Sequence, residues 1–240
     1  MSADRSQPKE SPSIVAPPLG YEPVPDIFEL PVGTNFGACS SVAVNSRGHI
    51  FVFHRSAQAL MEFDAEGTYL RTLVQGVFTR PHGLRIDAQD YIWATDGASN
   101  IVVKMDPNGR FVMVLGVKDS TAEWHQAGHL RCFDEPNDIA FGPDGEIYVS
   151  QGHGKGESRH PGTPCGLCMC RDQRHMFLAH GHTGKIMKLD LNGTVLGITG
   201  GQGKGPNQYG EAHFIAAAND ESALYIADPL NWRVQTLVRR

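Results

Sequence analysis

The sequence predicts an all-β fold of the β-propeller class, and three observations favour it. One strand–turn–strand pattern recurs five times along the 240 residues. Turn-forming residues are abundant, with 27 glycines and 15 prolines. Few stretches show the apolar period of an amphipathic helix. Short strands at regular spacing, separated by glycine- and proline-containing turns, are typical of propeller blades.

The repeats share a short apolar strand, a polar or glycine turn and a second apolar strand. They begin at Ser40, His82, Asn137, Cys165 and His213. After the first, second and fourth repeats, the turns "DAEG", "DPNG" and "DLNG" lie between two further predicted strands. The first repeat occupies 42 residues (82 − 40 = 42). This length accommodates the four antiparallel strands of one blade.

Two repeats depart from the pattern. The third lacks an outer strand pair, because the chain passes directly from "EIYVSQGHGKGESR" to "HPGTPCGL". The last repeat has three predicted strands, so we expect residues 27–32, "IFELPV", to supply the strand that closes the ring. Residues 1–19 are rich in Ser, Pro and charge, and we expect a disordered lead-in to a single propeller domain over residues 20–240.

Composition argues against several classes of protein. The net charge is −5, and no basic stripe with interleaved aromatic residues suggests nucleic-acid binding. No apolar run is long enough for a membrane span, and the polar start is not a signal peptide. The chain as given is therefore expected to be cytoplasmic, with secreted relatives left open.

Five cysteines, an odd number, exclude a complete disulfide framework.

The first position of each repeat is the most informative column. The innermost strand of every blade lines the central channel, so this column places Ser40, His82, Asn137, Cys165 and His213 in a ring around one axis. Two histidines and a cysteine are metal-ligand types. The alternative is that these polar residues only cap strand entries beside water. Both interpretations remain open on the pattern alone.

Other polar positions favour structural roles. Cys168 and Cys170 lie two apart on a predicted strand, and we interpret them as small core residues. His54 points away from Arg55 on its strand and is expected to serve packing. Asp96 and Asp228 recur at equivalent strand ends and are expected to accept hydrogen bonds from turn N–H groups. His180 and His182 are expected at the rim, where a surface metal is the alternative.

Several motifs carry a resemblance to a known family. The stretches "GHIFVFHRS", "FTRPHGLRID", "CFDEPNDIAFGPDGEIYVSQGHG" and "AHFIAAA…LYIADPLNWRVQ" resemble bacterial NHL-repeat proteins related to peptidyl-α-hydroxyglycine α-amidating lyase. The resemblance covers about residues 20–240 and implies a six-bladed propeller. It also implies a channel zinc held by three histidines, with an arginine and a tyrosine beside it. The reaction splits a peptidyl-α-hydroxyglycine into a peptide amide and glyoxylate.

The resemblance assigns roles residue by residue. His82 and His213 match two of the zinc histidines, and Arg55 matches the catalytic arginine. His153 stands where the family has its tyrosine, and as a base it is suited to neutral pH. The third zinc histidine has no match, and we expect Cys165 to be the remaining zinc ligand.

Two departures from the family follow from the same alignment. Phe214 occupies the position of the aspartate that binds structural calcium in the lyase, so no such calcium site is expected. About one blade of sequence is missing after Arg159.

Three functions are therefore weighed. The first is a zinc-dependent lyase of the amidating type, with a small-molecule or peptide substrate in the central channel. The second is a non-catalytic NHL propeller that binds a peptide or protein partner on one face. The third is an incomplete relative whose open ring must dimerise through exposed edge strands. Fold alone does not choose, because propellers carry both enzymes and scaffolds.

Overall fold

The computed structural model describes residues 15–118, 133–142, 144–151 and 164–240. In this part of the chain, four four-stranded antiparallel sheets and one two-stranded sheet are present, each following one predicted repeat. In chain order the strands are β1 (Tyr21–Pro23), β2 (Cys39–Val44), β3 (Ile50–His54), β4 (Leu60–Phe63), β5 (Tyr69–Val74), β6 (Pro81–Ile86), β7 (Ile92–Asp96), β8 (Ile101–Met105), β9 (Phe111–Gly116), β10 (Pro136–Phe141), β11 (Ile147–Gln151), β12 (Pro164–Met169), β13 (His175–His180), β14 (Lys185–Asp190), β15 (Val195–Gly200), β16 (Phe214–Ala217), β17 (Ala223–Asp228) and β18 (Arg233–Arg239). Two short 3₁₀ turns, η1 (Gly181–Thr183) and η2 (Pro229–Asn231), connect strands in the last two sheets.

The predicted Asp–Gly turns form the outer hairpins. The carboxylate of Asp64 accepts hydrogen bonds from the backbone N–H groups of Glu66 and Thr68, at 3.1 and 2.8 Å. Gly67 follows with a φ of +93°, a backbone conformation that glycine adopts without steric cost. Asp106 and Asp190 repeat the arrangement at the β8–β9 and β14–β15 turns. The local sequence therefore determines where the outer strand pairs form.

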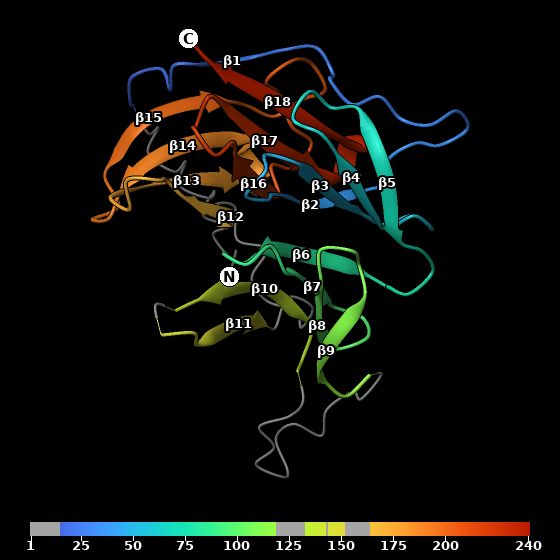
Figure 1. Cartoon of the computed structure of the whole chain (residues 1–240). Helices are drawn as coiled ribbons and strands as arrows, with labels where there is room; N and C mark the ends of the chain where they lie inside the picture. The colour runs from blue at the N-terminus through green and yellow to red at the C-terminus, as the bar shows by residue number, and fades with distance from the viewer. Residues whose placement is uncertain (1–14, 119–132, 143, 152–163) are drawn as a thin grey trace, which may run out of the picture.

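The sheets are arranged as the blades of a propeller. The first strands β12, β16, β2, β6 and β10 lie side by side in that order, and the later strands of each sheet lie toward the outside (Figure 1). Among the described residues, β10 and β12 do not pack against each other as the other neighbouring first strands do. In the ranges that the structure describes, the third sheet has only β10 and β11, in agreement with the sequence prediction. The all-β propeller fold is confirmed, and the described part of the chain contains four four-stranded blades and one two-stranded blade.

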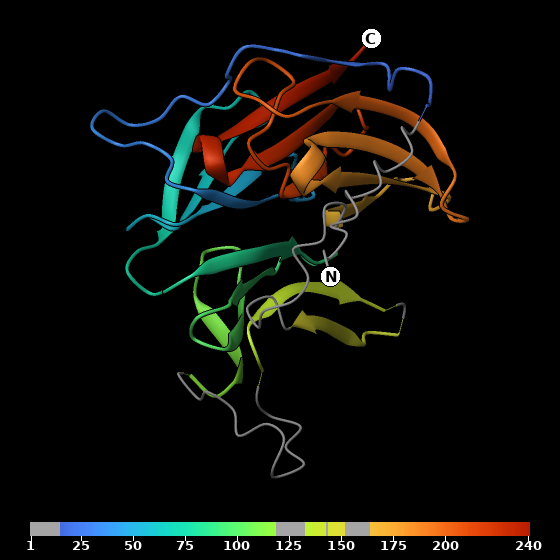
Figure 2. The same cartoon turned by 180° about the vertical axis from the view of Figure 1, so that it is seen from behind.

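The last blade is closed by an N-terminal strand, but not by the one expected. β1 pairs antiparallel with β18, with Tyr21 opposite Arg239, and completes the four-stranded sheet. The prediction that residues 27–32 form this strand was wrong. Ile27, Phe28 and Leu30 instead pack into the core, and Glu29 makes only an isolated bridge to Thr68. The first described residues of the chain, drawn in blue, run along the outer edges of the sheets, as the view from behind shows (Figure 2).

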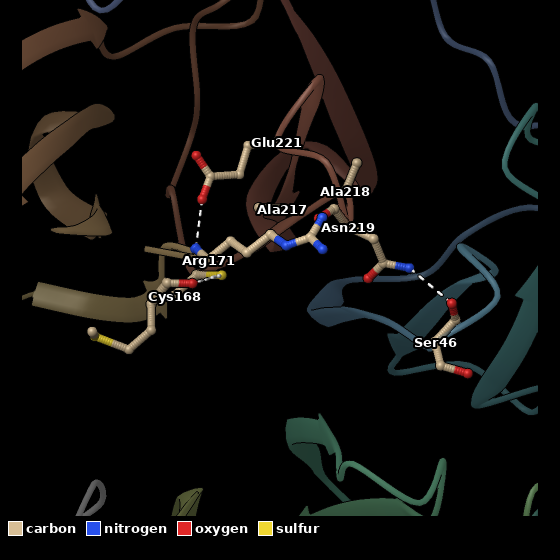
Figure 3. A pocket seen from close by; sticks show the side chains of 8 residues that line it. Ser46, Cys168, Arg171, Ala217, Ala218, Asn219 and Glu221 are labelled. Carbon is tan, nitrogen blue, oxygen red and sulfur yellow. Dashed lines mark hydrogen bonds between the residues drawn. The ribbon is translucent and has the colours of Figure 1, made fainter. Parts of the chain in front are cut away.

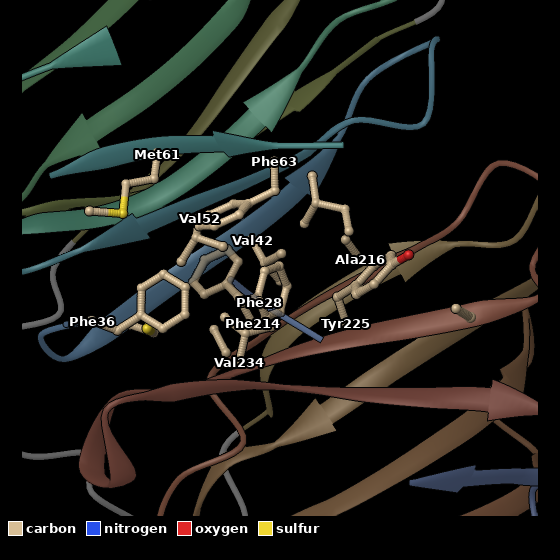
Figure 4. Packing of buried hydrophobic residues seen from close by; sticks show 14 residues of the cluster. Phe28, Phe36, Val42, Val52, Met61, Phe63, Phe214, Ala216, Tyr225 and Val234 are labelled. Carbon is tan, nitrogen blue, oxygen red and sulfur yellow. The ribbon is translucent and has the colours of Figure 1, made fainter. Parts of the chain in front are cut away.

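Large apolar side chains fill the space between the last and the first blades. Phe28, Phe36 and Phe63 meet edge-to-face, with ring centroids 4.9 to 5.8 Å apart. Phe214 and Tyr225 of the last blade join the same cluster (Figure 4). Aromatic edge-to-face contacts add to the free energy gained by burying apolar surface. This cluster therefore stabilises one packing arrangement of the last blade against the first. It therefore fixes the relative positions of the channel residues that those blades carry.

In the described part of the chain, no helix is long and apolar enough to cross a lipid bilayer.

Candidate functional site

The structure brings the two predicted channel histidines together. His82 lies near the start of β6, and His213 immediately precedes β16. Both are buried, with 4% and 3% of their surface exposed. Their ring centroids are 4.9 Å apart, at an interplanar angle of 64°. Residues from the second and the last blade thus meet on the propeller axis, as the repeat column predicted.

Each histidine is oriented by a backbone carbonyl of the neighbouring blade. Nδ1 of His82 lies 2.9 Å from the carbonyl oxygen of Asn137, and Nδ1 of His213 lies 2.7 Å from that of Ser40. A carbonyl oxygen can only accept, so both Nδ1 atoms carry the proton. In the neutral imidazole the lone pair is then on Nε2. This tautomer, fixed by a hydrogen bond at the other ring nitrogen, is the one that metal-ligating histidines use.

Two buried aspartates hold the segments that lead into the histidines. Asp96 accepts hydrogen bonds from the N–H groups of Thr79 and Arg80, at 2.6 and 2.9 Å. Asp228 accepts from the N–H groups of Gly210 and Glu211, both at 3.1 Å. Both aspartates are fully buried. The predicted capping role is confirmed, and it has a consequence for the site: each carboxylate fixes the backbone two residues before a channel histidine.

Phe214 lies against both histidines. Its ring centroid is 6.0 Å from that of His82 and 5.2 Å from that of His213. The Arg85 guanidinium lies 5.5 Å from the same ring and pairs with Asp138, with Nε–Oδ1 and Nη2–Oδ2 distances of 2.9 and 2.5 Å. The histidines are therefore packed on an aromatic ring beside a paired, half-buried arginine.

Arg55 is placed at the entrance to the same channel. It follows β3 directly, and its Nε donates to the carbonyl oxygen of Pro81 at 3.2 Å. Pro81 precedes His82, so the predicted catalytic arginine is anchored on the strand that carries the first histidine. Among the described residues, no carboxylate lies within salt-bridge distance of Arg55. Partial burial, with a smaller contribution from neighbouring Arg80, lowers the pKa of the guanidinium below its ordinary value.

Cys165 lies close to the channel but is not grouped with the histidines as a complete metal site. Its side chain is half-buried, and burial, with a smaller contribution from Glu211, raises the pKa of the thiol to about 11. In the ranges that the structure describes, no three His, Cys, Asp or Glu side chains are grouped so that they could hold a metal ion. Cys165 as a ligand stays a prediction, and His153 lies outside the described residues.

The remaining predicted polar residues have structural roles. His54 is fully buried, and its Nδ1 lies 3.3 Å from the N–H nitrogen of Gly37 and 3.0 Å from Oγ of Ser56. Burial lowers the pKa of His54 to about 4. Cys170 is buried in the core, and Cys168 packs against the same cluster. The packing interpretations of all three are confirmed.

A hollow of about 450 Å³ lies at the opposite ends of the first strands. It is formed by the turns that follow β2, β12 and β16, and it contains Cys168, Arg171, Asn219 and Glu221 (Figure 3). Arg171 reaches across it and donates to the carbonyl oxygen of Asn219 at 3.3 Å. The histidines lie at the starts of the first strands, so this hollow is separate from the candidate site.

Comparisons with known proteins agree with the predicted resemblance. No protein-family model matches the chain. A Caenorhabditis elegans protein named as a peptidyl-alpha-hydroxyglycine alpha-amidating lyase is 27% identical over 225 residues, covering 83% of this chain and 55% of that protein. A Drosophila melanogaster peptidyl-alpha-hydroxyglycine alpha-amidating lyase 1 is 26% identical over 145 residues, covering 49% of this chain and 26% of that protein. The chain thus spans about half the length of the first of these relatives and less of the second.

Solved structures support the fold. Kuenenia stuttgartiensis hydrazine synthase matches with a TM-score of 0.57 and 10% identity, covering 88% of this chain and 99% of that one. A Staphylococcus aureus virginiamycin B lyase matches with a TM-score of 0.50 and 12% identity, covering 88% of this chain and 98% of that one. At these identities the likeness concerns architecture alone. The chain is a β-propeller homologous to proteins named peptidyl-α-hydroxyglycine α-amidating lyases.

Proposed function

We propose that this chain is a zinc-dependent lyase of the amidating type, which cleaves the C–N bond of a carbinolamide to give an amide and glyoxylate. The observation that carries the proposal is the pair of channel histidines. His82 and His213 converge from distant blades, and each Nδ1 is held by a backbone carbonyl. The names of the sequence relatives support the same reaction class.

Two of the proposed zinc ligands are brought together, with their ring centroids 4.9 Å apart. His82 and His213 would hold it through Nε2, and Cys165 remains the predicted third ligand. Zinc, when bound, supplies Lewis-acid stabilisation of the negative charge that develops during cleavage. The backbone carbonyls of Asn137 and Ser40 orient the two imidazoles before any ligand arrives.

The protein's own residues would divide the remaining work. In the reaction the substrate hydroxyl loses its proton, a C=O bond forms, the C–N bond breaks and the amide nitrogen gains a proton. Arg55, whose Nε donates to the Pro81 carbonyl oxygen, would bind the substrate carboxylate or the developing oxyanion. His153 is the predicted base for the hydroxyl proton. Phe214 gives the histidines an apolar wall, and a lower local dielectric strengthens these electrostatic interactions.

The test is release of glyoxylate from an N-acyl-α-hydroxyglycine by the zinc-loaded protein. We expect Arg55→Ala to lower kcat/KM by roughly 100-fold, since one oxyanion-stabilising group is worth about that much. Arg47→Ala, which removes an arginine exposed on a distant turn, is the matched control and should leave the rate unchanged. Glyoxylate formation no faster than in the protein-free blank would overturn the proposal.

A further inference from the structure

A groove of about 520 Å³ lies between the last and the first blade, on the face opposite the channel histidines. The β16–β17 turn of the last blade and the β2–β3 and β4–β5 turns of the first blade contribute to it. Asn219 joins the two blades at this point, because its Nδ2 donates to the carbonyl oxygens of Asn45 and Ser46, at 3.0 and 3.1 Å (Figure 3). The groove therefore has walls that are held together by hydrogen bonds between the blades.

Two hydroxyl side chains of the last blade line the groove side by side. Tyr225 of β17 and Thr236 of β18 lie directly opposite each other in the antiparallel pairing, so their side chains share one face of the sheet. Only 5% and 4% of their surfaces are exposed. Oγ1 of Thr236 is buried, and no described residue forms a hydrogen bond with it. Because a buried hydroxyl without a partner costs free energy, a polar group bound in the groove would offset that cost.

The Tyr225 hydroxyl is the second atom available to a ligand. The tyrosine ring packs in the hydrophobic cluster with Phe28, and its hydroxyl lies at the end of the ring away from Phe36 (Figure 4). In the ranges that the structure describes, this hydroxyl also forms no hydrogen bond. Burial, with smaller contributions from Asp220 and Glu66, raises the pKa of the phenol. Both hydroxyl oxygens can therefore accept a hydrogen bond from a donor in the groove.

Two carboxylates line the groove together with these hydroxyls. Asp220 accepts a hydrogen bond from the N–H of Ser222 at 2.9 Å, and its hydrogen bonds with Ser222 lower the pKa of the carboxyl group. Glu66 is exposed in the β4–β5 turn, and neither carboxylate forms an ion pair with another described residue. Arg47 also lines the groove, but its Nη2 lies 3.6 Å from Oε1 of the buried Glu62. The unpaired charge of the groove is therefore negative.

Apolar side chains contribute much of the remaining lining. Val24 and Ile27 come from the segment that follows β1, and Ala223 and Val238 lie opposite each other on β17 and β18. This surface suits a hydrocarbon chain, whereas the carboxylates can only accept hydrogen bonds and repel an anion. A wholly apolar ligand would leave Oγ1 of Thr236 without a partner. The lining as a whole therefore favours a positively charged donor attached to an aliphatic chain.

We propose that this groove binds a primary ammonium ion carried on an aliphatic chain. The ammonium donates to the hydroxyl oxygens of Thr236 and Tyr225 and to the carboxylates of Asp220 and Glu66, while the chain lies along the apolar lining. An ammonium group has three N–H donors and no acceptor, and its hydrogen bonds to carboxylates are stronger than neutral ones. A free alkylamine and a lysine side chain share this chemistry. The groove is separate from the channel, so this inference does not rest on the proposed function.

The test is a ligand-observed NMR titration of the full chain with butylamine, 1-butanol and Nα-acetyl-lysine methylamide. We expect butylamine to bind about tenfold more tightly than 1-butanol, which has the same chain but no charge. Tighter binding of the lysine derivative than of butylamine would identify a lysine side chain as the natural source of the ammonium. Tighter binding of butylamine would identify a free amine.

Thr236→Val is the most informative variant, because valine has nearly the shape of threonine and lacks the hydroxyl. We expect it to lower the affinity for butylamine about tenfold, since a hydrogen bond to a charged group is lost. Its free energy of unfolding should be unchanged or increased, because the substitution removes a hydroxyl without a partner. Thr72→Val is the matched control outside the groove. The Thr72 hydroxyl forms a hydrogen bond with the Tyr69 hydroxyl at 2.9 Å, so this variant should lose stability and keep the affinity.

A second variant tests the carboxylates. Asp220→Asn combined with Glu66→Gln should weaken butylamine binding by about tenfold and leave 1-butanol binding unchanged. Equal affinity for butylamine and 1-butanol, no binding of any probe, or an affinity for butylamine that survives Thr236→Val would overturn the inference. The titrations require neither zinc nor turnover, so their outcome is independent of the glyoxylate assay.

Discussion

His82 and His213 face each other across the propeller axis with ring centroids 4.9 Å apart, although they belong to the second and the last blade. Their Nδ1 atoms point outward to carbonyl oxygens at 2.9 and 2.7 Å. Each of these two blades therefore holds a histidine that a backbone carbonyl of the next blade orients. The geometry of the site therefore depends on how neighbouring blades pack against each other.

Asp228 should be essential to the His213 segment. Asp228→Asn removes a fully buried carboxylate that accepts from the N–H groups of Gly210 and Glu211. We expect a loss of about 2–4 kcal/mol in the free energy of unfolding, because buried donors lose a charged acceptor. Urea denaturation measures the loss. Asp190→Asn, at an exposed turn with the same type of hydrogen bonds, should cost much less, because water can replace the lost acceptor there. An equal loss in the two variants would contradict the role of Asp228.

Gly83 should tolerate no side chain. A Cβ at Gly83 would lie 2.3 Å from the carbonyl oxygen of Asn137, the same oxygen that orients His82. Its φ is not in the left-handed region, so the effect of Gly83→Ala is steric alone. We expect β6 and β10 to be forced apart at a cost of about 1–3 kcal/mol. Gly201→Ala, where a Cβ meets nothing within 4 Å, should be neutral or slightly stabilising. Thermal unfolding measures the stability of the two variants. A Gly83→Ala protein that is as stable as Gly201→Ala would contradict the expected steric clash.

His54 should make stability depend on pH. Its folded pKa is lowered to about 4 from 6.5, so the unfolded chain binds the proton first as the pH falls. Stability contributed by neutral His54 is complete above pH 6.5 and is lost as the pH falls toward 4. The full shift corresponds to about 3 kcal/mol. His54→Leu should flatten this part of the pH profile of chemical denaturation. An unchanged profile in His54→Leu would refute the assignment.

Much of the site could be predicted because a repeat converts sequence position into spatial position. The column that contains His82 and His213 meets on the axis because every blade starts its first strand there. The roles of Asp96 and Asp228 were also accessible, since an aspartate at a strand end bonds nearby N–H groups. Glycine-containing turns such as Asp64–Gly67 placed the outer hairpins for the same local reason.

The strand that closes the last blade and the ion pair between Arg80 and Glu135 could not be predicted in the same way. The segment at residues 27–32 alternates like a strand, yet Phe28 gains more by packing on Phe36 and Phe63. β1 is only three residues long, and its pairing with β18 joins the two ends of the chain. The ion pair between Arg80 and Glu135 depends on how two blades pack against each other, and a single repeat does not encode that contact.

The central claim is that His82 and His213 form a zinc site, and the most direct test is elemental analysis of protein purified without added metal. We predict about one zinc per chain in the parent, little in His82→Ala and His213→Ala, and a full complement in His175→Ala. Cys165→Ser should also lose zinc if the thiol is the third ligand, whereas retention would keep the site and remove Cys165 from it. A parent protein that contains no zinc and takes up none on titration would contradict the account.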